Sequence, residues 1–284
     1  SNAGHPIRFG TSSNGTDYTT GVTHTGTPGS AGAKTTLVLG TGVSTLYYSC
    51  LNHTGMGGQI NTNSTAGASN FDGSIQTVAK ANQTKGFSIV TWNGTGNAGS
   101  IGHGLGSTPK WMLVKRRTGG TAYWEVYHTS VGAAKVLYLN TSDAEASSSA
   151  SWNNTEPTSS VFTVGNSSGT NASGSTYVGY IWSEVAGFSK FGSYSGSGVS
   201  GKEITLGFKP AWIMIKSTGS QTDWWIWDSA RGNNKFLLAG SSAGGNTNDA
   251  VIGNYPMNAT STGFTIDNTA DLNTSGVNYI YMAF

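Results

Sequence analysis

The segment Pro210-Ala-Trp-Ile-Met-Ile-Lys216 has an earlier counterpart in Pro109-Lys-Trp-Met-Leu-Val-Lys115. Each runs from a Pro to a Lys through a Trp and a short apolar run that includes β-branched residues. This composition is typical of a strand that is buried on both faces. The Pro stands at the entry of the strand, where a missing N–H does least harm. We therefore expect a buried β-strand at each of the two segments.

The residues around these two segments also recur in the same order. Trp124 matches Trp225 at the same offset as Trp111 and Trp212, and Lys135 matches Lys235 after a deletion of one residue. Further matched pairs are Phe87 with Phe188, Leu105 with Leu206, Phe162 with Phe264 and Tyr177 with Tyr279. A recurrence of this length indicates an internal repeat. It predicts two copies of one unit, at residues 87–186 and 187–284.

The composition favours an all-β protein. The chain has 284 residues, of which 42 are Gly, 11% are aromatic and only 10% are charged. Short apolar runs alternate with turns rich in Gly, Asn and Ser, and no helical periodicity of useful length is present. This pattern is typical of β-sandwich modules. Residues 65–86 have the composition of a linker followed by one strand.

Charge and cysteine content exclude several classes of protein. The net charge is +2 and forms no basic stripe, so nucleic acid is not an expected partner. No apolar run approaches the length needed to span a membrane. A single Cys excludes an internal disulfide framework. Ser1-Asn-Ala3 resembles the remnant of a removed tag, which would make the chain a piece of a longer protein.

One motif in residues 1–64 carries the chemistry of a metal site. Cys50, His53 and Met56 follow one another at C-x-x-H-x-x-M spacing, and His5 lies upstream. This resembles the copper loop of the cupredoxins, the plastocyanin and amicyanin family, and residues 1–64 would form part of such a fold. The resemblance implies that His5 and His53 are imidazole ligands, Cys50 the thiolate and Met56 the axial thioether. The alternative is a copper-free segment in which Cys50 is a small buried hydrophobe.

Most of residues 70–284 resembles a repeated β domain of tail-fibre and appendage proteins from marine bacteriophages. The resemblance lies in Gly86-Phe-Ser-Ile-Val-Thr91, Gly102-His-Gly-Leu-Gly106, Trp152-Asn-Asn-Thr155 and Ala186-Gly-Phe-Ser-Lys-Phe-Gly-Ser-Tyr194. It implies a concanavalin- or SPRY-like sandwich for each copy. It also implies an extracellular place on the exterior of the phage particle, where other virion proteins and a host receptor are the partners. Fibre proteins are often trimers, but no coiled-coil or collagen-like run is present to drive one.

Two functions follow from these features, and neither is enzymatic, because the 13 acidic residues are scattered singly. The first is a virion protein that binds a cell-surface polysaccharide or a protein receptor. The second is a blue-copper protein with an electron-transfer or structural metal. For the first function we expect the face that carries Trp124 and Trp225 to lie in the core. The exposed residues expected to stack on sugar rings are then Tyr123, Tyr127 and Trp224.

Overall fold

The structure is a computed structural model that describes residues 4–39, 43–60, 67–232, 235–239 and 257–284. Regular structure in these residues is almost entirely β-strand. The exceptions are one four-residue α-helix, α1 (Ser149–Trp152), and one 3-10 helix, η1 (Gln83–Lys85). The prediction of an all-β, sandwich-type fold is therefore confirmed. No helix in the described part of the chain is long and apolar enough to cross a membrane.

The chain divides into two compact units, residues 1–70 with 78–80 and residues 71–77 with 81–284. The first unit holds a three-stranded sheet of order β1-β4-β5 and the hairpin β2-β3. Its strands are β1 (Ile7–Gly10), β2 (Val22–Thr25), β3 (Lys34–Leu37), β4 (Leu46–Cys50) and β5 (Gly57–Ile60). The expected boundary at residues 64–65 and the segment 1–3 lie outside the described residues.

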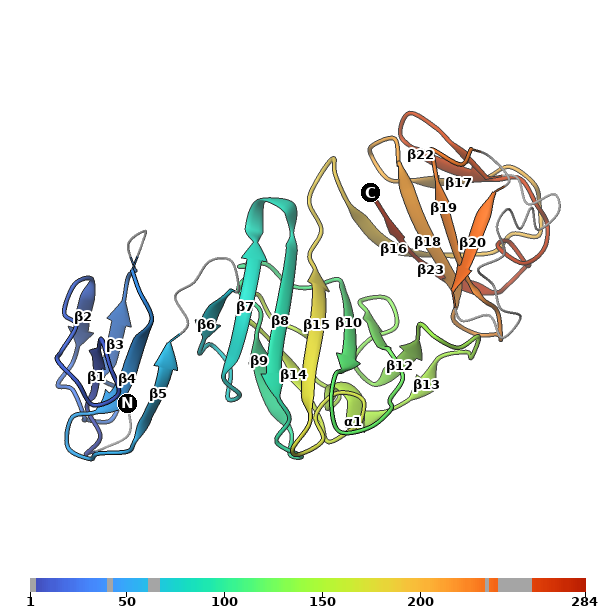
Figure 1. The fold of residues 1–284 in the computed structure, drawn as a ribbon. Coiled ribbons are helices and arrows are strands. Elements are labelled where there is room, and N and C mark those ends of the chain that lie inside the picture. The colour runs from blue at the N-terminus through green and yellow to red at the C-terminus, as the bar shows by residue number, and fades with distance from the viewer. Residues whose placement is uncertain (1–3, 40–42, 61–66, 233–234, 240–256) are drawn as a thin grey trace. The chain divides into compact units, whose positions relative to one another are not determined.

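An eight-stranded sheet has the order β13-β12-β11-β10-β15-β8-β7-β6 (Figure 1). Its strands are β6 (Ala68–Asn70), β7 (Thr77–Asn82), β8 (Phe87–Asn93), β10 (Trp111–Arg116), β11 (Glu125–His128), β12 (Lys135–Tyr138), β13 (Ala146–Ser147) and β15 (Thr176–Trp182). The apolar run expected to form a strand at residues 109–115 is thus β10. A separate pair joins β9 (Gly99–Gly102) to β14 (Val161–Val164). It packs on the larger sheet through an edge-to-face contact between Phe162 and Trp92.

The described residues from 187 onward form a second sandwich. A five-stranded sheet of order β16-β23-β18-β19-β20 faces a three-stranded sheet of order β17-β22-β21 (Figure 1). The strands are β16 (Lys190–Ser195), β17 (Lys202–Thr205), β18 (Trp212–Ser217), β19 (Trp224–Asp228), β20 (Phe236–Ala239), β21 (Met257–Ala259), β22 (Gly263–Ile266) and β23 (Asn278–Ala283). One buried apolar cluster joins the two sheets. Ile213 and Trp225 of the larger sheet meet Phe264 and Ile266 of the smaller one.

The two halves of the second unit, residues 87–186 and 187–284, have the same order of strands. The order β8-β15-β10-β11-β12 in the first half corresponds to β16-β23-β18-β19-β20 in the second. The duplication of sequence that would explain this correspondence remains a prediction.

The strand register corrects the expected match between the halves by one residue. Leu113 pairs with Val126 in the first half, and Met214 pairs with Ile226 in the second. Because Leu113 corresponds to Met214, Trp124 corresponds to Trp224 and not to Trp225. The missing residue therefore lies before β19, in the connection from β18. In a strand, a shift of one residue exchanges the two faces of the sheet.

The expected faces of β11 were consequently wrong. Glu125 and Tyr127 point into the first sandwich and are 4% and 2% exposed, whereas Trp124 is only half-buried. In β19, Trp225 and Trp227 face the core of the second sandwich. Trp224 and Val126 instead belong to an apolar cluster between the two halves, which we call the inter-half cluster. It consists of Trp111, Val126, Leu137, Phe191, Met214, Trp224, Ile280 and Met282.

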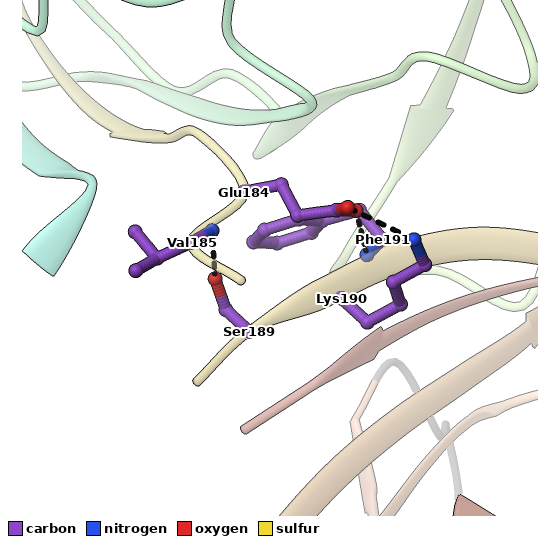
Figure 2. A network of polar contacts seen from close by, with 5 residues as sticks. All are labelled: Glu184, Val185, Ser189, Lys190 and Phe191. Atoms are coloured by element: carbon purple, nitrogen blue, oxygen red, sulfur yellow. Dashed lines mark hydrogen bonds and ion pairs between the residues drawn. The ribbon is translucent and has the colours of Figure 1, made fainter. Parts of the chain in front are cut away.

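The connection between the halves is held by its own hydrogen bonds (Figure 2). The Glu184 carboxylate accepts from the Lys190 amine at 2.9 Å and from the Phe191 N–H at 3.3 Å. The Val185 N–H donates to the Ser189 hydroxyl at 2.9 Å. A partly exposed ion pair contributes little alone. Together, these bonds fix the course of the chain from β15 into β16.

Candidate functional site

Cys50 is held at the start of a tight loop in the first unit. It is the last residue of β4, and β5 begins at Gly57. The loop closes because the Cys50 N–H donates to the Met56 carbonyl at 2.8 Å. Gly55 adopts φ +80°, a left-handed conformation that a residue without a side chain adopts at little cost. The short loop therefore turns back beside its own start, carrying His53 with it.

Pairing with the N-terminal strand brings His5 to the same place. In the register of β1 and β4, Ile7 lies opposite Cys50. Beyond the strand, the Leu51 N–H donates to the Pro6 carbonyl at 2.9 Å, and the Asn52 side-chain amide donates to the Gly4 carbonyl at 3.1 Å. These bonds hold the chain on either side of His5 against the loop that carries Cys50.

The three side chains converge on one point. Cys50 Sγ lies 3.4 Å from Nδ1 of His53 and 3.7 Å from Nδ1 of His5. The two imidazole rings are 4.8 Å apart between centroids, and the three ligand atoms lie within 4.8 Å of one another. Cys50 is 7% exposed, whereas His53 is exposed and His5 is intermediate. The thiol is thus shielded while one imidazole reaches the surface.

This arrangement fits a single soft metal ion. Metal–nitrogen and metal–sulfur bonds of about 2.0 and 2.3 Å at tetrahedral to trigonal angles place the ligand atoms about 3.5–3.8 Å apart. The two observed sulfur–nitrogen distances lie at or close to that range. Two imidazoles and one thiolate are the equatorial donors of blue-copper sites. The structure therefore clusters three of the four predicted ligands. The side chain of the fourth, Met56, is 47% exposed, and only the Met56 carbonyl is bonded to Cys50.

Two of the three predicted stacking residues are buried, which corrects their assignment. Tyr127 is 2% exposed, packs edge to face on Trp152 and donates its hydroxyl to Glu156. Burial, followed by the bond to Glu156, raises the pKa of Tyr127 above its usual range. Trp224 is 0% exposed and donates its indole N–H to the Tyr138 carbonyl at 2.9 Å. Both residues support the fold and offer no face to a ligand.

Tyr123 is the exception. It is 54% exposed, and its ring lies 4.9 Å from that of Tyr138. It borders a polar pocket of about 580 Å³ whose lining also includes Glu125, Asn140 and Ser168. No local pattern in the sequence predicts this pocket, because Glu125 and Ser168 lie far apart along the chain.

A comparison with protein families assigns most of the chain to one family. Residues 60–284 match one family model, described as a domain of unknown function (DUF7483). No curated protein and no solved structure matches the chain. The single family model spans both halves of the second unit. The cluster of His5, Cys50 and His53 lies outside the matched residues.

Proposed function

The chain belongs to the DUF7483 family, and we propose that the segment before the family match binds one copper ion. The ligands are Cys50 Sγ and the Nδ1 atoms of His5 and His53. The observation that carries this proposal is the convergence of these three atoms within 4.8 Å, on residues from two different segments of the chain.

The donor set favours copper over other metals. Thiolate and imidazole are soft and borderline ligands that Mg²⁺ and Ca²⁺ do not select. Structural zinc sites are closed by four ligands, whereas three donors and a weak axial group are typical of blue copper. Copper bound here would supply one-electron redox chemistry. The contribution of the chain is to hold the three ligands together and to keep water from the Cys50 sulfur.

The same ligands would stabilise the first unit. His5 precedes β1 and Cys50 ends β4, so a shared ion would link the beginning of the unit to its central strand. A ligand that binds only the folded state raises the free energy of unfolding in proportion to its affinity and concentration. We therefore propose that the copper has at least a structural role. The exposed His53 edge is the point at which an electron-transfer partner would approach.

Titration with Cu(II) tests the proposal. Wild-type protein is expected to develop an intense visible charge-transfer band that saturates at one equivalent. Cys50→Ser removes the thiolate and should abolish the band. His24→Ala is the matched control, because His24 lies in the same unit and contacts Thr35 instead of the cluster. Loss of the band in His24→Ala, or its survival in Cys50→Ser, would place the copper elsewhere.

A second proposal concerns where the protein acts. The resemblance of residues 70–284 to phage appendage proteins leads us to propose the exterior of a phage particle, with other virion proteins as neighbours. Antibody labelling of purified particles tests this directly. Label on the particle surface is expected, and label that stays in the host-cell fraction would contradict the proposal.

A further inference from the structure

The pocket beside Tyr123 lies where β11 begins and β12 ends, in the first half of the second unit. Its volume is about 580 Å³, within the range of pockets that hold small ligands. The loop before β11 and the loop after β14 supply the rest of its wall. The lining residues are Thr121, Ala122, Tyr123, Glu125, Tyr138, Asn140, Ser167, Ser168 and Gly169.

Glu125 provides a buried acceptor in this pocket. It is 4% exposed, and its Oε1 accepts a hydrogen bond from the Ser167 hydroxyl at 2.7 Å. Oε2 is buried and has no hydrogen bond within the described part of the protein. Leaving a buried acceptor unpaired costs about 1–3 kcal/mol, and more for a charged group. An unpaired, buried carboxylate oxygen in the lining of a pocket indicates that a bound ligand supplies the missing hydrogen-bond donor.

The backbone around Glu125 is shaped to admit its carboxylate. A Cβ added at Gly169 would lie 1.9 Å from Glu125 Oε1, so a larger residue there would force the carboxylate to move. Burial raises the pKa of Glu125, and the hydrogen bond from Ser167 opposes the shift. Packing the carboxyl group of Glu125 at this position therefore costs free energy of folding.

The rim of the pocket combines an aromatic face with free polar groups. Tyr123 and Tyr138 have rings 4.9 Å apart and inclined by 44°, and Tyr123 is largely exposed. Asn140 uses its carbonyl oxygen to accept from the Trp124 N–H at 2.8 Å, a bond that does not involve its NH₂ donors. Ser168 is exposed, and its backbone carbonyl accepts a hydrogen bond from the Tyr177 hydroxyl.

We propose that this pocket binds a neutral saccharide, with the apolar face of a sugar ring on Tyr123 and a sugar hydroxyl donating to Glu125. Asn140 and Ser168 would form hydrogen bonds with further hydroxyl groups of the sugar. Among the described residues that line the pocket, Glu125 is the sole charged side chain, so it disfavours acidic sugars by like-charge repulsion. The ligand is bound and not cleaved, because glycoside hydrolysis uses a pair of carboxylates and the lining offers one. This inference does not depend on the copper proposal.

A glycan array on the full chain is the first test, with neutral hexose and N-acetylhexosamine oligosaccharides beside uronic-acid and sialic-acid glycans. Calorimetric titration with the best neutral glycan, and with choline as a cationic probe of the two tyrosines, gives affinities. Tyr123→Ala and Glu125→Gln are the informative variants. Phe71→Ala is the control, because Phe71 is a 50% exposed aromatic residue outside the pocket.

The expected result is binding of neutral glycans that falls about ten-fold in Tyr123→Ala, the size of one good aromatic contact. Glu125→Gln should lose at least as much affinity while its thermal midpoint stays equal or rises, because a buried carboxyl group is removed. That combination separates a binding role from a structural one. If Glu125→Gln fails to fold, Tyr123→Ala decides alone, since its side chain is exposed. The proposal is overturned if wild type binds no neutral glycan, if choline or acidic glycans bind in their place, or if Tyr123→Ala binds as wild type does.

Discussion

Replacement of Trp224 by alanine is expected to loosen the second unit where its two halves meet. The Trp224 side chain is fully buried, its ring meets that of Trp111 at 5.8 Å between centroids, and its indole N–H donates to the Tyr138 carbonyl. It thus joins β19 of one half to β10 and β12 of the other. Truncation of a buried Trp to Ala costs about 3–5 kcal/mol.

Part of this loss comes from the hydrogen bond and part from the cavity. Trp224→Phe keeps most of the apolar volume and removes the indole donor, which leaves the Tyr138 carbonyl with only the long bond from the Thr141 N–H at 3.4 Å. That change is expected to cost about 1–2 kcal/mol. The remainder of the Trp224→Ala loss would then measure packing in the inter-half cluster. Whole domains have about 5–15 kcal/mol of stability, so the larger loss should be readily measured.

Equilibrium unfolding in urea, followed by far-ultraviolet circular dichroism, gives these values. Tyr123→Ala is the control, because an exposed aromatic residue away from the cluster should change stability by no more than about 0.5 kcal/mol. Limited proteolysis offers a second readout, with faster cleavage near residues 184–191 expected in Trp224→Ala. A loss below about 1 kcal/mol in Trp224→Ala, with unchanged proteolysis, would refute the burial of this residue between the halves.

Two further predictions concern pH. Burial lowers the pKa of His128 to about 4. Between pH 6.5 and 4, His128 therefore binds a proton in the unfolded chain but stays neutral in the folded chain. Stability should therefore fall by about 3 kcal/mol from this residue as pH drops to 4, and the fall should be absent in His128→Gln when the two unfolding free energies are compared. Burial also lowers the pKa of Lys216 to about 8, below its unfolded value of 10.5, against the opposing pull of Asp143 and Asp223. Lys216 should therefore add about 2 kcal/mol of stability between pH 8 and 10, and urea titrations of Lys216→Met compared with wild type should show the loss of this contribution.

The fold class was predictable because it depends on local composition. The continuous apolar run at residues 210–216 has no polar alternation, which indicates burial on both faces. The structure gives the reason in β18, where Ile213 and Ile215 face the core of their own sandwich and Met214 faces the other half.

The orientation of β11 was predicted wrongly, whereas Trp225 of β19 lies in the core as predicted. Both faces of β19 carry Trp, so hydrophobicity does not say which face points inward. The expected orientation of β11 rested on the match of Trp124 with Trp225, and a single residue missing from the connection before β19 makes that match wrong. A buried Glu125 was hidden by the same error, since a carboxylate is ordinarily assigned to the outside.

The candidate metal ligands were predictable to a greater extent than the pocket. The spacing of Cys50 and His53 within one loop already restricts their separation, and the motif singled out His5 as well. The pairing of β1 with β4 brings His5 close to Cys50, a long-range contact that sequence spacing alone does not predict. The pocket, in contrast, is assembled from loops around residues 121 and 168, and no local pattern links them.

The most direct test of the central claim is the copper content of the chain. Wild-type protein loaded with Cu(II), freed of excess metal by dialysis and measured by elemental analysis should retain one copper per chain. Cys50→Ser treated in the same way should retain almost none. Wild-type protein that keeps no copper, or keeps the same amount as Cys50→Ser, would contradict a metal site formed by His5, Cys50 and His53.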